Sequence, residues 1–327
     1  MTTTFVTGIT GQDGTYLVER LLAEGTEVHG LVRPGDGGEG ALLARHPGVV
    51  LHEGDLGDAE RLAAVVAEVA PDEVVNLAGI SSVALSWQEP VLTARLSGLA
   101  VAVLLEAAQR VQESTGRAVR FLQASSSEIF GQPEVEPQDE RTPVRPVSPY
   151  GSAKAFAHHQ VAVYRGRGLH AATAILFNHE SPLRPTTFVT RKITAAAAAI
   201  GRTGTGTIAL GNLDARRHWG WAPDYVDAML RALRHDVPDD FVVATGRTHS
   251  VRDFAEAALR RAGIGDDWAR FVAVDPQFLR PADASVMVGD PTKAERELGW
   301  RRTVEFEEVV GRMVDHDLEL AEKEAGA

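Results

Sequence analysis

Short apolar runs alternate with longer amphipathic segments through the first half of the chain. The runs have the length of buried strands, and the segments between them place apolar residues at helical spacing. Strand, helix and strand in this repeated order predict βαβ units that share one parallel sheet, with helices on both faces. The predicted strands are residues 4–7, 27–32, 49–53, 73–78, 119–124 and 171–177. One predicted helix ends at Ala23, two cover 59–69 and 90–112, and a fourth begins near Pro149.

The alternation breaks after Phe177, which indicates a second structural unit. We predict an α/β fold with a doubly wound, Rossmann-like parallel sheet and a smaller mixed C-terminal lobe. The dinucleotide-binding domain is residues 1–177 with returning segments at about 214–245, and the substrate domain is 178–213 and 246–327. Helices of the second part are predicted at 188–201, 251–262 and 306–323, and a polar glycine-rich loop is expected at 35–40.

A glycine-rich turn follows the first strand, with Gly8, Gly11 and Gly14 at regular spacing. Glycine allows the backbone to turn tightly and to approach a pyrophosphate, which then lies on the amide groups of the helix N-terminus. The strand before the turn and the helix after it make this string a prediction of dinucleotide binding. The predicted cofactor-binding residues of the turn are Gly8, Thr10, Gly11, Gln12, Asp13 and Gly14.

The ends of the second and third strands indicate which dinucleotide is bound. An NAD site usually has an acidic residue at the end of the second strand, whereas this chain has Arg33, which suits a 2′-phosphate. NADP is therefore favoured over NAD, and a solvated arginine at a strand end is the alternative. Asp55 and Leu56 follow the third strand and are placed to flank an adenine.

Catalytic residue types gather between Ser125 and Lys154. Ser148 and Pro149 can begin a helix, and Tyr150 and Lys154 then lie four apart on one face of it. A nearby cation favours the phenolate of a tyrosine. Lowering the pKa of a phenol from about 10 to neutrality requires roughly 4 kcal/mol, of which one ammonium supplies a part and an oxidised nicotinamide could supply more.

Composition excludes several classes of function. The chain has 327 residues, a net charge of −12 and no cysteine. The negative charge argues against nucleic acid or an anionic membrane as the main partner, and the missing cysteine removes disulfides and thiolate metal sites. The N-terminus lacks the features of a signal peptide. We expect a cytoplasmic protein with no metal site.

These motifs together resemble the extended short-chain dehydrogenase/reductase superfamily, and within it the GDP-mannose 4,6-dehydratase family. The matching strings are 8–14, 125–128, 148–150, 175–182, 188–194 and 289–293. The resemblance implies a lyase that oxidises the hexose at C4, removes water across C5 and C6, and returns the hydride to C6. It also implies NADP that stays bound and is recycled.

The resemblance assigns the catalytic roles to Ser126, Glu128, Tyr150 and Lys154. Tyr150 is the expected base for the C4 hydroxyl proton, with Lys154 holding the ribose and lowering the phenol pKa. Glu128 is the expected acceptor of the C5 proton, and Ser126 the hydrogen-bond partner of the C4 oxygen. A capping or surface carboxylate is the alternative role for Glu128.

Further binding residues are implied by the same resemblance. The remaining cofactor contacts are expected at Leu77, Ala78, Gly79, Ser81, Tyr150, Lys154, His179 and Arg184. The nucleotide-sugar is expected to contact Ser82, Ser126, Glu128, Asn178, Val189, Lys192, Arg217, Arg280 and Asp283.

Some positions depart from the family pattern. Ile80, Ser81 and Ser82 stand where the family has Gln-Ser-His, and the segment after Arg33 is too short for the family's tetramer loop. We therefore expect a homodimer through the helices at 90–112 and Tyr150, with a tetramer as the alternative. The alternative functions are a TDP- or UDP-glucose 4,6-dehydratase, a nucleotide-sugar epimerase or reductase, and a non-catalytic NADP-binding scaffold.

Overall fold

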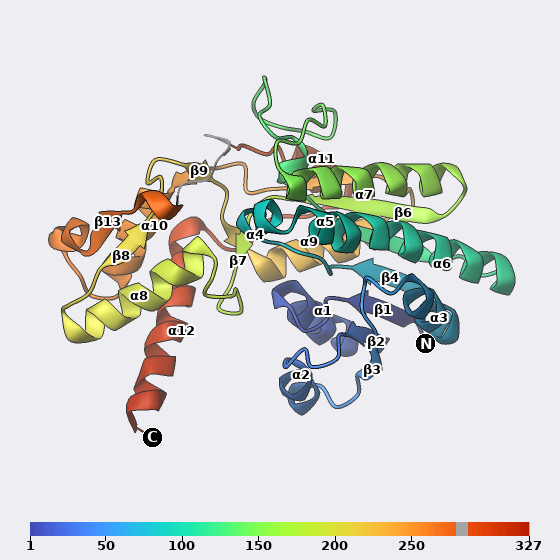
Figure 1. Cartoon of the computed structure of the whole chain (residues 1–327), viewed down its shortest axis with the longest axis horizontal. Coiled ribbons are helices and arrows are strands. Elements are labelled where there is room, and N and C mark those ends of the chain that lie inside the picture. Colours follow the sequence, from blue (N-terminus) through green and yellow to red (C-terminus); the bar gives the residue numbers. More distant parts are fainter. Residues whose placement is uncertain (279–286, 327) are drawn as a thin grey trace.

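A seven-stranded parallel sheet forms the centre of the larger lobe, in the order β11-β6-β5-β4-β1-β2-β3. The computed structural model describes residues 1–278 and 287–326 (Figure 1). The strand order reverses between β1 and β4, which is where doubly wound sheets bind their ligands. The strands are β1 Thr3–Thr7, β2 Glu27–Val32, β3 Val50–Glu53, β4 Glu73–Asn76, β5 Arg120–Ser126, β6 His170–Leu176 and β11 Asp240–Val243.

Helices cover both faces of this sheet because successive strand residues point to opposite sides. Val6 packs toward α1 (Gln12–Ala23) and α9 (Ala222–Arg234) in one core cluster. Its neighbour Phe5 belongs to the opposite cluster, with α3 (Ala59–Val69), α6 (Ala100–Thr115) and α7 (Pro149–Gly166). Buried residues on both faces explain why these strands are apolar without alternation. The predicted α/β, doubly wound fold is confirmed.

The predicted helix at 90–112 is longer and less regular than expected. It consists of α5 (Pro90–Ala94), a π-helical turn at Arg95–Leu99 and α6. Residues 90–115 are apolar enough and long enough to cross a membrane by composition alone, yet half of that window is buried inside the protein. Packing against α3 and α7 accounts for the buried half, as in the core helix of a soluble protein.

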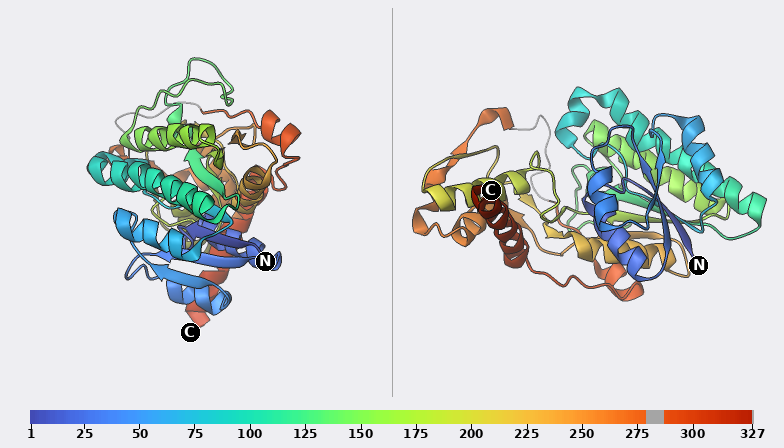
Figure 2. Two further views of the ribbon diagram at one scale, coloured as in Figure 1. Left: turned by 90° about the vertical axis from the view of Figure 1, so that its right-hand side faces the viewer. Right: turned by 90° about the horizontal axis from the view of Figure 1, so that it is seen from below.

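The smaller lobe lies beside the sheet domain and ends in the long helix α12 (Figures 1 and 2). Its core joins α8 (Val189–Thr203), α10 (Val251–Arg261) and α12 (Phe306–Gly326) through a separate apolar cluster. A buried ion pair between Arg191 on α8 and Asp317 on α12, with 2.5 Å between nitrogen and oxygen, crosses this core.

Short paired strands connect distant parts of the chain and have no counterpart in the predicted elements. They are β7 (His179–Glu180) with β10 (Gly220–Trp221), β8 (Ile208–Leu210) with β13 (Val272–Val274), and β9 (Arg216–Arg217) with β12 (His249–Ser250). The loop expected at 35–40 runs into a helix, α2. The remaining helices are α2 Glu39–Arg45, α4 Val83–Gln88, α11 Thr292–Glu297 and the 3₁₀ turns Ser127–Ile129, Asp266–Phe271 and Pro276–Phe278.

Candidate active site

The turn between β1 and α1 and the first turn of α1 leave no room for a side chain at Gly8 and Gly14. A Cβ on Gly14 would lie 2.3 Å from the Gly8 carbonyl oxygen, and one on Gly8 would lie 2.9 Å from the Ala78 nitrogen. Gly8 also has a φ of +72°, a left-handed conformation that favours glycine. Thr10 lies half-buried within this turn, and Gly11 is the N-cap residue directly before α1. The turn is therefore a cradle whose backbone can approach a pyrophosphate at a helix N-terminus.

Arg33 and Asp55 stand at the ends of neighbouring strands, β2 and β3. The Arg33 side chain is 64% exposed and its guanidinium lies 3.6 Å from the Asp36 carboxylate. Asp55 is exposed and accepts a hydrogen bond of 2.6 Å from the Gly57 nitrogen, and the adjacent Leu56 is half-buried. Arg33 is thus available to an anion from solvent, while the Asp55 carboxylate stabilises the turn after β3.

The segment after β4 brings Leu77, Ala78, Gly79, Ser81 and Ser82 to the same edge of the sheet. Gly79 has a φ of +143°, and a Cβ there would lie 2.8 Å from the Ser97 hydroxyl oxygen. Ser81 is exposed. The Ser82 hydroxyl accepts a hydrogen bond from the Leu85 nitrogen and so caps α4. Ser82 therefore has a structural role beside the substrate role that the sequence suggested.

Ser126 and Glu128 lie where β5 leaves the sheet. Ser126 ends the strand, is 9% exposed, and its hydroxyl accepts a hydrogen bond of 3.3 Å from the Glu128 nitrogen. The half-buried Glu128 lies within the short 3₁₀ turn that follows. The Ser126 side chain also hydrogen-bonds the phenol of Tyr150. The serine, the carboxylate and the phenol are thus brought together.

Tyr150 and Lys154 project from the first turns of α7. The Ser148 hydroxyl caps this helix by accepting from the Gly151 nitrogen at 3.0 Å, and Pro149 occupies its first position. Both side chains are buried. The Lys154 ammonium lies 5.9 Å from the centroid of the Tyr150 ring and donates a 2.8 Å hydrogen bond to the carbonyl oxygen of Ala124.

Burial dominates the ionisation of this pair. It raises the pKa of Tyr150 to about 12, although the hydrogen bond from Ser126 acts in the opposite direction and the Glu128 carboxylate adds to the rise. Burial also lowers the pKa of Lys154 to about 8. In the protein alone the phenol pKa therefore lies above its ordinary value, because the cost of burying the phenolate is the largest effect.

His179 and Arg184 lie on the loop that follows β6. The His179 ring lies 2.9 Å from the Asp13 carboxylate and 2.8 Å from the Phe177 carbonyl oxygen. The Arg184 guanidinium lies 3.4 Å from the carboxylate of Glu180 and 3.8 Å above the ring centroid of Phe188. Asn178, which precedes His179, is exposed. This loop therefore joins the dinucleotide turn to the substrate side of the site.

The expected substrate cations are partly engaged within the protein. Lys192 on α8 donates to the Ala209 carbonyl oxygen at 2.6 Å and lies 3.5 Å from the centroid of the Phe278 ring. Arg217 is buried and donates to the Arg216 carbonyl oxygen at 2.7 Å. Val189, at the start of α8, is 37% exposed. Arg280 and Asp283, two further residues expected at the substrate, lie outside the described residues.

Two residues near these groups were not predicted as site residues from the sequence. Phe278 is 45% exposed beside Lys192, and an aromatic residue just before the expected substrate contact Arg280 is the signal that could have drawn attention to it. Glu180 is 2% exposed and accepts a hydrogen bond of 2.6 Å from the Thr190 hydroxyl. Its position between His179 and Arg184 in the sequence was the available signal.

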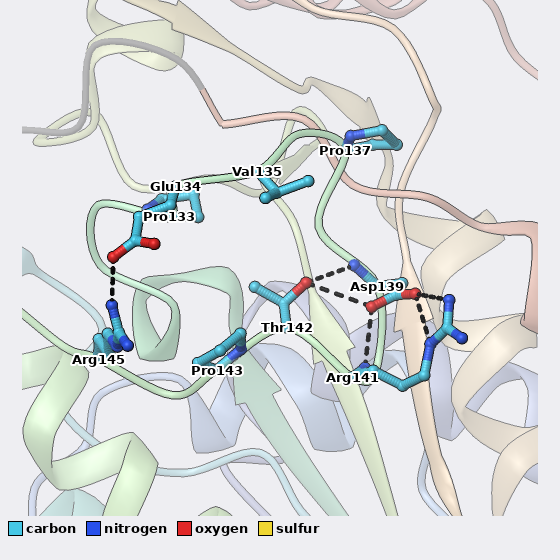
Figure 3. Close-up of a pocket in the computed structure, with 9 residues that line it drawn as sticks. All are labelled: Pro133, Glu134, Val135, Pro137, Asp139, Arg141, Thr142, Pro143 and Arg145. Atoms are coloured by element: carbon cyan, nitrogen blue, oxygen red, sulfur yellow. Dashed lines mark hydrogen bonds and ion pairs between the residues drawn. The ribbon is translucent and has the colours of Figure 1, made fainter.

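A separate cavity of about 330 Å³ lies in the proline-rich loop before α7 (Figure 3). Ion pairs between Glu134 and Arg145 and between Asp139 and Arg141 hold its walls. None of the predicted site residues within 1–278 and 287–326 lines it, so it does not mark the reacting centre. Its lining residues are Pro133, Glu134, Val135, Pro137, Asp139, Arg141, Thr142, Pro143 and Arg145.

Comparison with known proteins identifies the family. A family model described as GDP-mannose 4,6 dehydratase matches residues 5–313. The chain belongs to the GDP-mannose 4,6-dehydratase family. The resemblance predicted from the sequence motifs is therefore confirmed, and the assignment extends over both lobes.

Relatives of this family match over nearly their whole length. GDP-mannose 4,6 dehydratase 1 of Arabidopsis thaliana is 44% identical over 330 residues, which is 98% of this chain and 90% of that protein. The Homo sapiens GDP-mannose 4,6 dehydratase is 41% identical, and the aligned region covers 96% of this chain and 91% of that protein. Among solved structures, the Thermus thermophilus UDP-glucose 4-epimerase, a complex with NAD, has a TM-score of 0.81 at 28% identity, covering 96% and 98% of the two chains.

Proposed function

We propose that this protein converts GDP-mannose to GDP-4-keto-6-deoxymannose as a 4,6-dehydratase. The observation that carries the proposal is the half-buried carboxylate of Glu128, placed two residues after a serine that hydrogen-bonds the buried phenol of Tyr150. Oxidation and reduction at a sugar hydroxyl require the serine, phenol and lysine. A carboxylate in the same place supplies the additional base that water elimination requires. Membership of the dehydratase family supports the same reaction.

The first step is removal of the C4 hydroxyl proton as the hydride leaves C4. Tyr150 is the base, and Ser126 shares the hydrogen bond to the C4 oxygen. The phenol requires assistance, because burial raises its pKa to about 12. A nicotinamide cofactor would, when bound, accept the hydride and supply a positive charge. Lys154 would hold its ribose and add a second positive charge within the buried site.

Water elimination follows from the new ketone at C4. The ketone acidifies the proton on C5, because the electrons left behind delocalise into the carbonyl group. Glu128 accepts that proton, and the hydroxyl group leaves C6 as water with the proton that Tyr150 removed from the C4 hydroxyl. Return of the hydride to C6 and of the proton to C5 completes the reaction without a net change of redox state.

NADP is the dinucleotide that the site favours. The Arg33 guanidinium is largely exposed at the end of β2, with Asp36 at 3.6 Å as its acidic neighbour. An exposed arginine can form a bidentate contact with a 2′-phosphate, whereas NAD would offer a ribose hydroxyl that an acidic residue binds better. The glycine cradle at Gly8 and Gly14 accepts the pyrophosphate of either dinucleotide.

The diphosphate and base of the substrate are assigned to the smaller lobe and the loop that leads into it. Lys192 and Arg217 supply positive charge against an overall net charge of −12, and Asn178 and Val189 supply exposed contacts. Phe278 is added to this set because its exposed ring lies against the Lys192 ammonium. Ser82, Arg280 and Asp283 complete the assignment by family resemblance.

A cytoplasmic homodimer is the proposed state in solution. Val91, Leu99 and Val163 are 81%, 57% and 54% exposed on α5, the π-helical turn and α7, which lie side by side. Phe156 on α7 extends this apolar surface. Burying such side chains between two copies follows the rule that large exposed apolar patches mark interfaces. The double variant Val91→Glu and Val163→Glu should sediment as a monomer, whereas Val237→Glu, an exposed site outside this surface, should not.

One assay tests the reaction. The purified protein is incubated separately with GDP-mannose, TDP-glucose and UDP-glucose, without any added reductant, and the products are followed by mass spectrometry. Loss of one water from GDP-mannose, with no net consumption of NADPH, is the expected result. An isobaric product would instead indicate an epimerase, a requirement for external NADPH a reductase, and water loss from a glucose nucleotide a different substrate.

A further inference from the structure

A set of hydrogen bonds ties the dinucleotide turn to the loop that follows β6. The Gln12 amide donates to the His179 carbonyl oxygen at 3.2 Å, and the Gln12 amide oxygen accepts from the Ser181 hydroxyl at 2.9 Å. Between these contacts the His179 ring lies 2.9 Å from the Asp13 carboxylate. Gln12 and Asp13 form the first turn of α1, directly after Gly11. The loop is therefore fastened at the point where a pyrophosphate would lie.

The surroundings of His179 require a doubly protonated ring. Its Nδ1 faces the Phe177 carbonyl oxygen at 2.8 Å and its Nε2 faces the Asp13 carboxylate at 2.9 Å. Neither oxygen can donate, so both ring nitrogens must carry a proton for both bonds to form. The ring is 8% exposed and stacks on Tyr225 with 4.5 Å between centroids. His179 is thus a buried imidazolium paired with a carboxylate.

The far end of the same loop is tied to the smaller lobe. The Pro182 carbonyl oxygen accepts a 3.0 Å hydrogen bond from the Arg191 side chain, which is itself ion-paired with Asp317 on α12. The loop that these contacts hold carries Asn178 and Arg184, which are assigned to substrate and cofactor. Movement of the loop away from α1 would therefore disturb both binding sites.

We propose that Asp13 and His179 form an ionic latch that fixes the loop 178–184 against the dinucleotide turn and so retains the cofactor between the two hydride transfers. This inference rests on the proposed function, in which the hydride taken from C4 must be returned to C6 of the same sugar. Escape of the reduced cofactor between the steps would leave an oxidised sugar that the enzyme cannot reduce. Asp13 and His179 act here as positioning residues, whatever contacts they also make with the cofactor.

The latch should respond to pH in a defined direction. The charged and titratable groups that face the ring are Asp13 from α1, Arg184 from its own loop and Tyr225 from α9. Burial opposes the charge on the ring, but the Asp13 carboxylate outweighs it and the pKa of His179 is raised. A neutral ring can donate only one of the two hydrogen bonds. The latch is therefore closed below that raised pKa and weakens as the pH rises through it.

The test measures how fast NADPH leaves the protein. The wild type and the variants Asp13→Asn, His179→Gln and the double variant are loaded with NADPH, and its release is followed by fluorescence after dilution into excess NADP. Each single variant should release NADPH about tenfold faster or more, and the double variant no faster than the singles. His29→Gln, a histidine paired with Glu27 away from the turn, is the matched control and should behave as the wild type.

A pH series separates the latch from a general loss of structure. Release from the wild type should accelerate as the pH rises above the normal histidine range, whereas release from His179→Gln should not change with pH. Unchanged release in both single variants, or additive effects in the double variant, would overturn the proposal. Asp13→Asn decides the matter if His179→Gln does not fold. Release of NADPH is measured without any sugar, so a failed dehydratase assay and a failed latch give different results.

Discussion

The Lys154 ammonium donates its hydrogen bond to the Ala124 carbonyl oxygen at 2.8 Å and lies 5.9 Å from the ring centroid of Tyr150. The two residues share a helix face, and both side chains are buried. The phenol takes its hydrogen bond from Ser126 instead. Lysine thus contributes a fixed positive charge whose position is set by the main chain of β5.

Replacing Lys154 by methionine should abolish turnover and stabilise the fold. Burial lowers the pKa of this lysine from 10.5 to about 8, so at neutral pH the folded state carries a charge that costs up to about 3 kcal/mol. Methionine fills a similar volume without that charge. We expect the free energy of unfolding, measured with urea at pH 7, to rise by about 1–3 kcal/mol. A less stable variant would contradict this account of the buried ammonium.

The same stabilisation should depend on pH. Between about pH 8 and 10.5 the folded lysine has lost its proton while the unfolded lysine keeps it, so the unfolded state binds more protons. Stability of the wild type therefore gains from this group as the pH rises through that range. The advantage of Lys154→Met should shrink accordingly. Urea unfolding curves of both proteins at about pH 7 and about pH 9.5 provide the comparison.

Removing the Ser126 hydroxyl should make the Tyr150 phenol less able to act as the base. The hydrogen bond from Ser126 lowers the pKa of Tyr150, so its loss in Ser126→Ala moves that pKa further above its present value of about 12. Less phenolate is then accessible at neutral pH. We expect kcat at pH 7 to fall by about tenfold or more and the rise of kcat with pH to shift toward alkaline values. An unshifted profile would assign Ser126 to binding only.

Buried strands were predictable from the sequence because a strand that is buried requires apolar residues. The strand 27–32 was predicted with its observed bounds, and its apolar residues Val28, Leu31 and Val32 are all buried. The helix with Tyr150 was predicted from Ser148 and Pro149, which cap and begin it as expected. In these segments the helix-capping residues and the apolar residues that become buried can both be recognised from the sequence.

Pairings between distant segments were not predictable. The strands His179–Glu180 and Gly220–Trp221 are too short for any period to appear, and they exist because the loop after β6 meets the start of α9. The direction of the Lys154 ammonium depends on where the Ala124 carbonyl oxygen lies in three dimensions. The pairing of His179 with Asp13, 166 positions apart, is of the same kind. A family resemblance names such residues without giving their partners.

Replacing Arg33 by glutamate should change the dinucleotide preference. The side chain is 64% exposed and its acidic neighbour Asp36 lies at 3.6 Å, so the fold should tolerate the change. A carboxylate at the end of β2 repels a 2′-phosphate and can accept a hydrogen bond from a ribose hydroxyl. We expect the Kd for NADPH to rise at least tenfold and the Kd for NADH to fall or stay constant, as measured by fluorescence titration. Arg45→Glu, on the nearby helix α2, is the control.

Breaking the ion pair between Arg191 and Asp317 should destabilise the smaller lobe strongly. Both side chains are buried, at 7% and 6% exposure, so removal of one leaves an unpaired charge in the core. We expect Asp317→Asn to lose about 3–5 kcal/mol of unfolding free energy. The double variant Arg191→Met and Asp317→Leu should recover most of that loss, because no charge then remains buried. Urea unfolding of the three proteins tests both statements.

Replacing Glu128 by glutamine should separate oxidation from elimination. The amide keeps the size of the side chain and removes the base, and the Glu128 carboxylate also raises the pKa of Tyr150. The phenol should therefore ionise more readily in the variant, so that C4 oxidation continues while the C5 proton stays in place. We expect enzyme loaded with NADP and given GDP-mannose to accumulate reduced nicotinamide absorbance, with water loss slowed at least a hundredfold.

The glutamine substitution at Glu134, an exposed carboxylate of the neighbouring loop paired with Arg145, should leave both steps intact. If the variant at Glu128 still released water at the rate of the wild type, the carboxylate would have no part in elimination, and oxidation by Tyr150 would have to be coupled to a base elsewhere on the sugar.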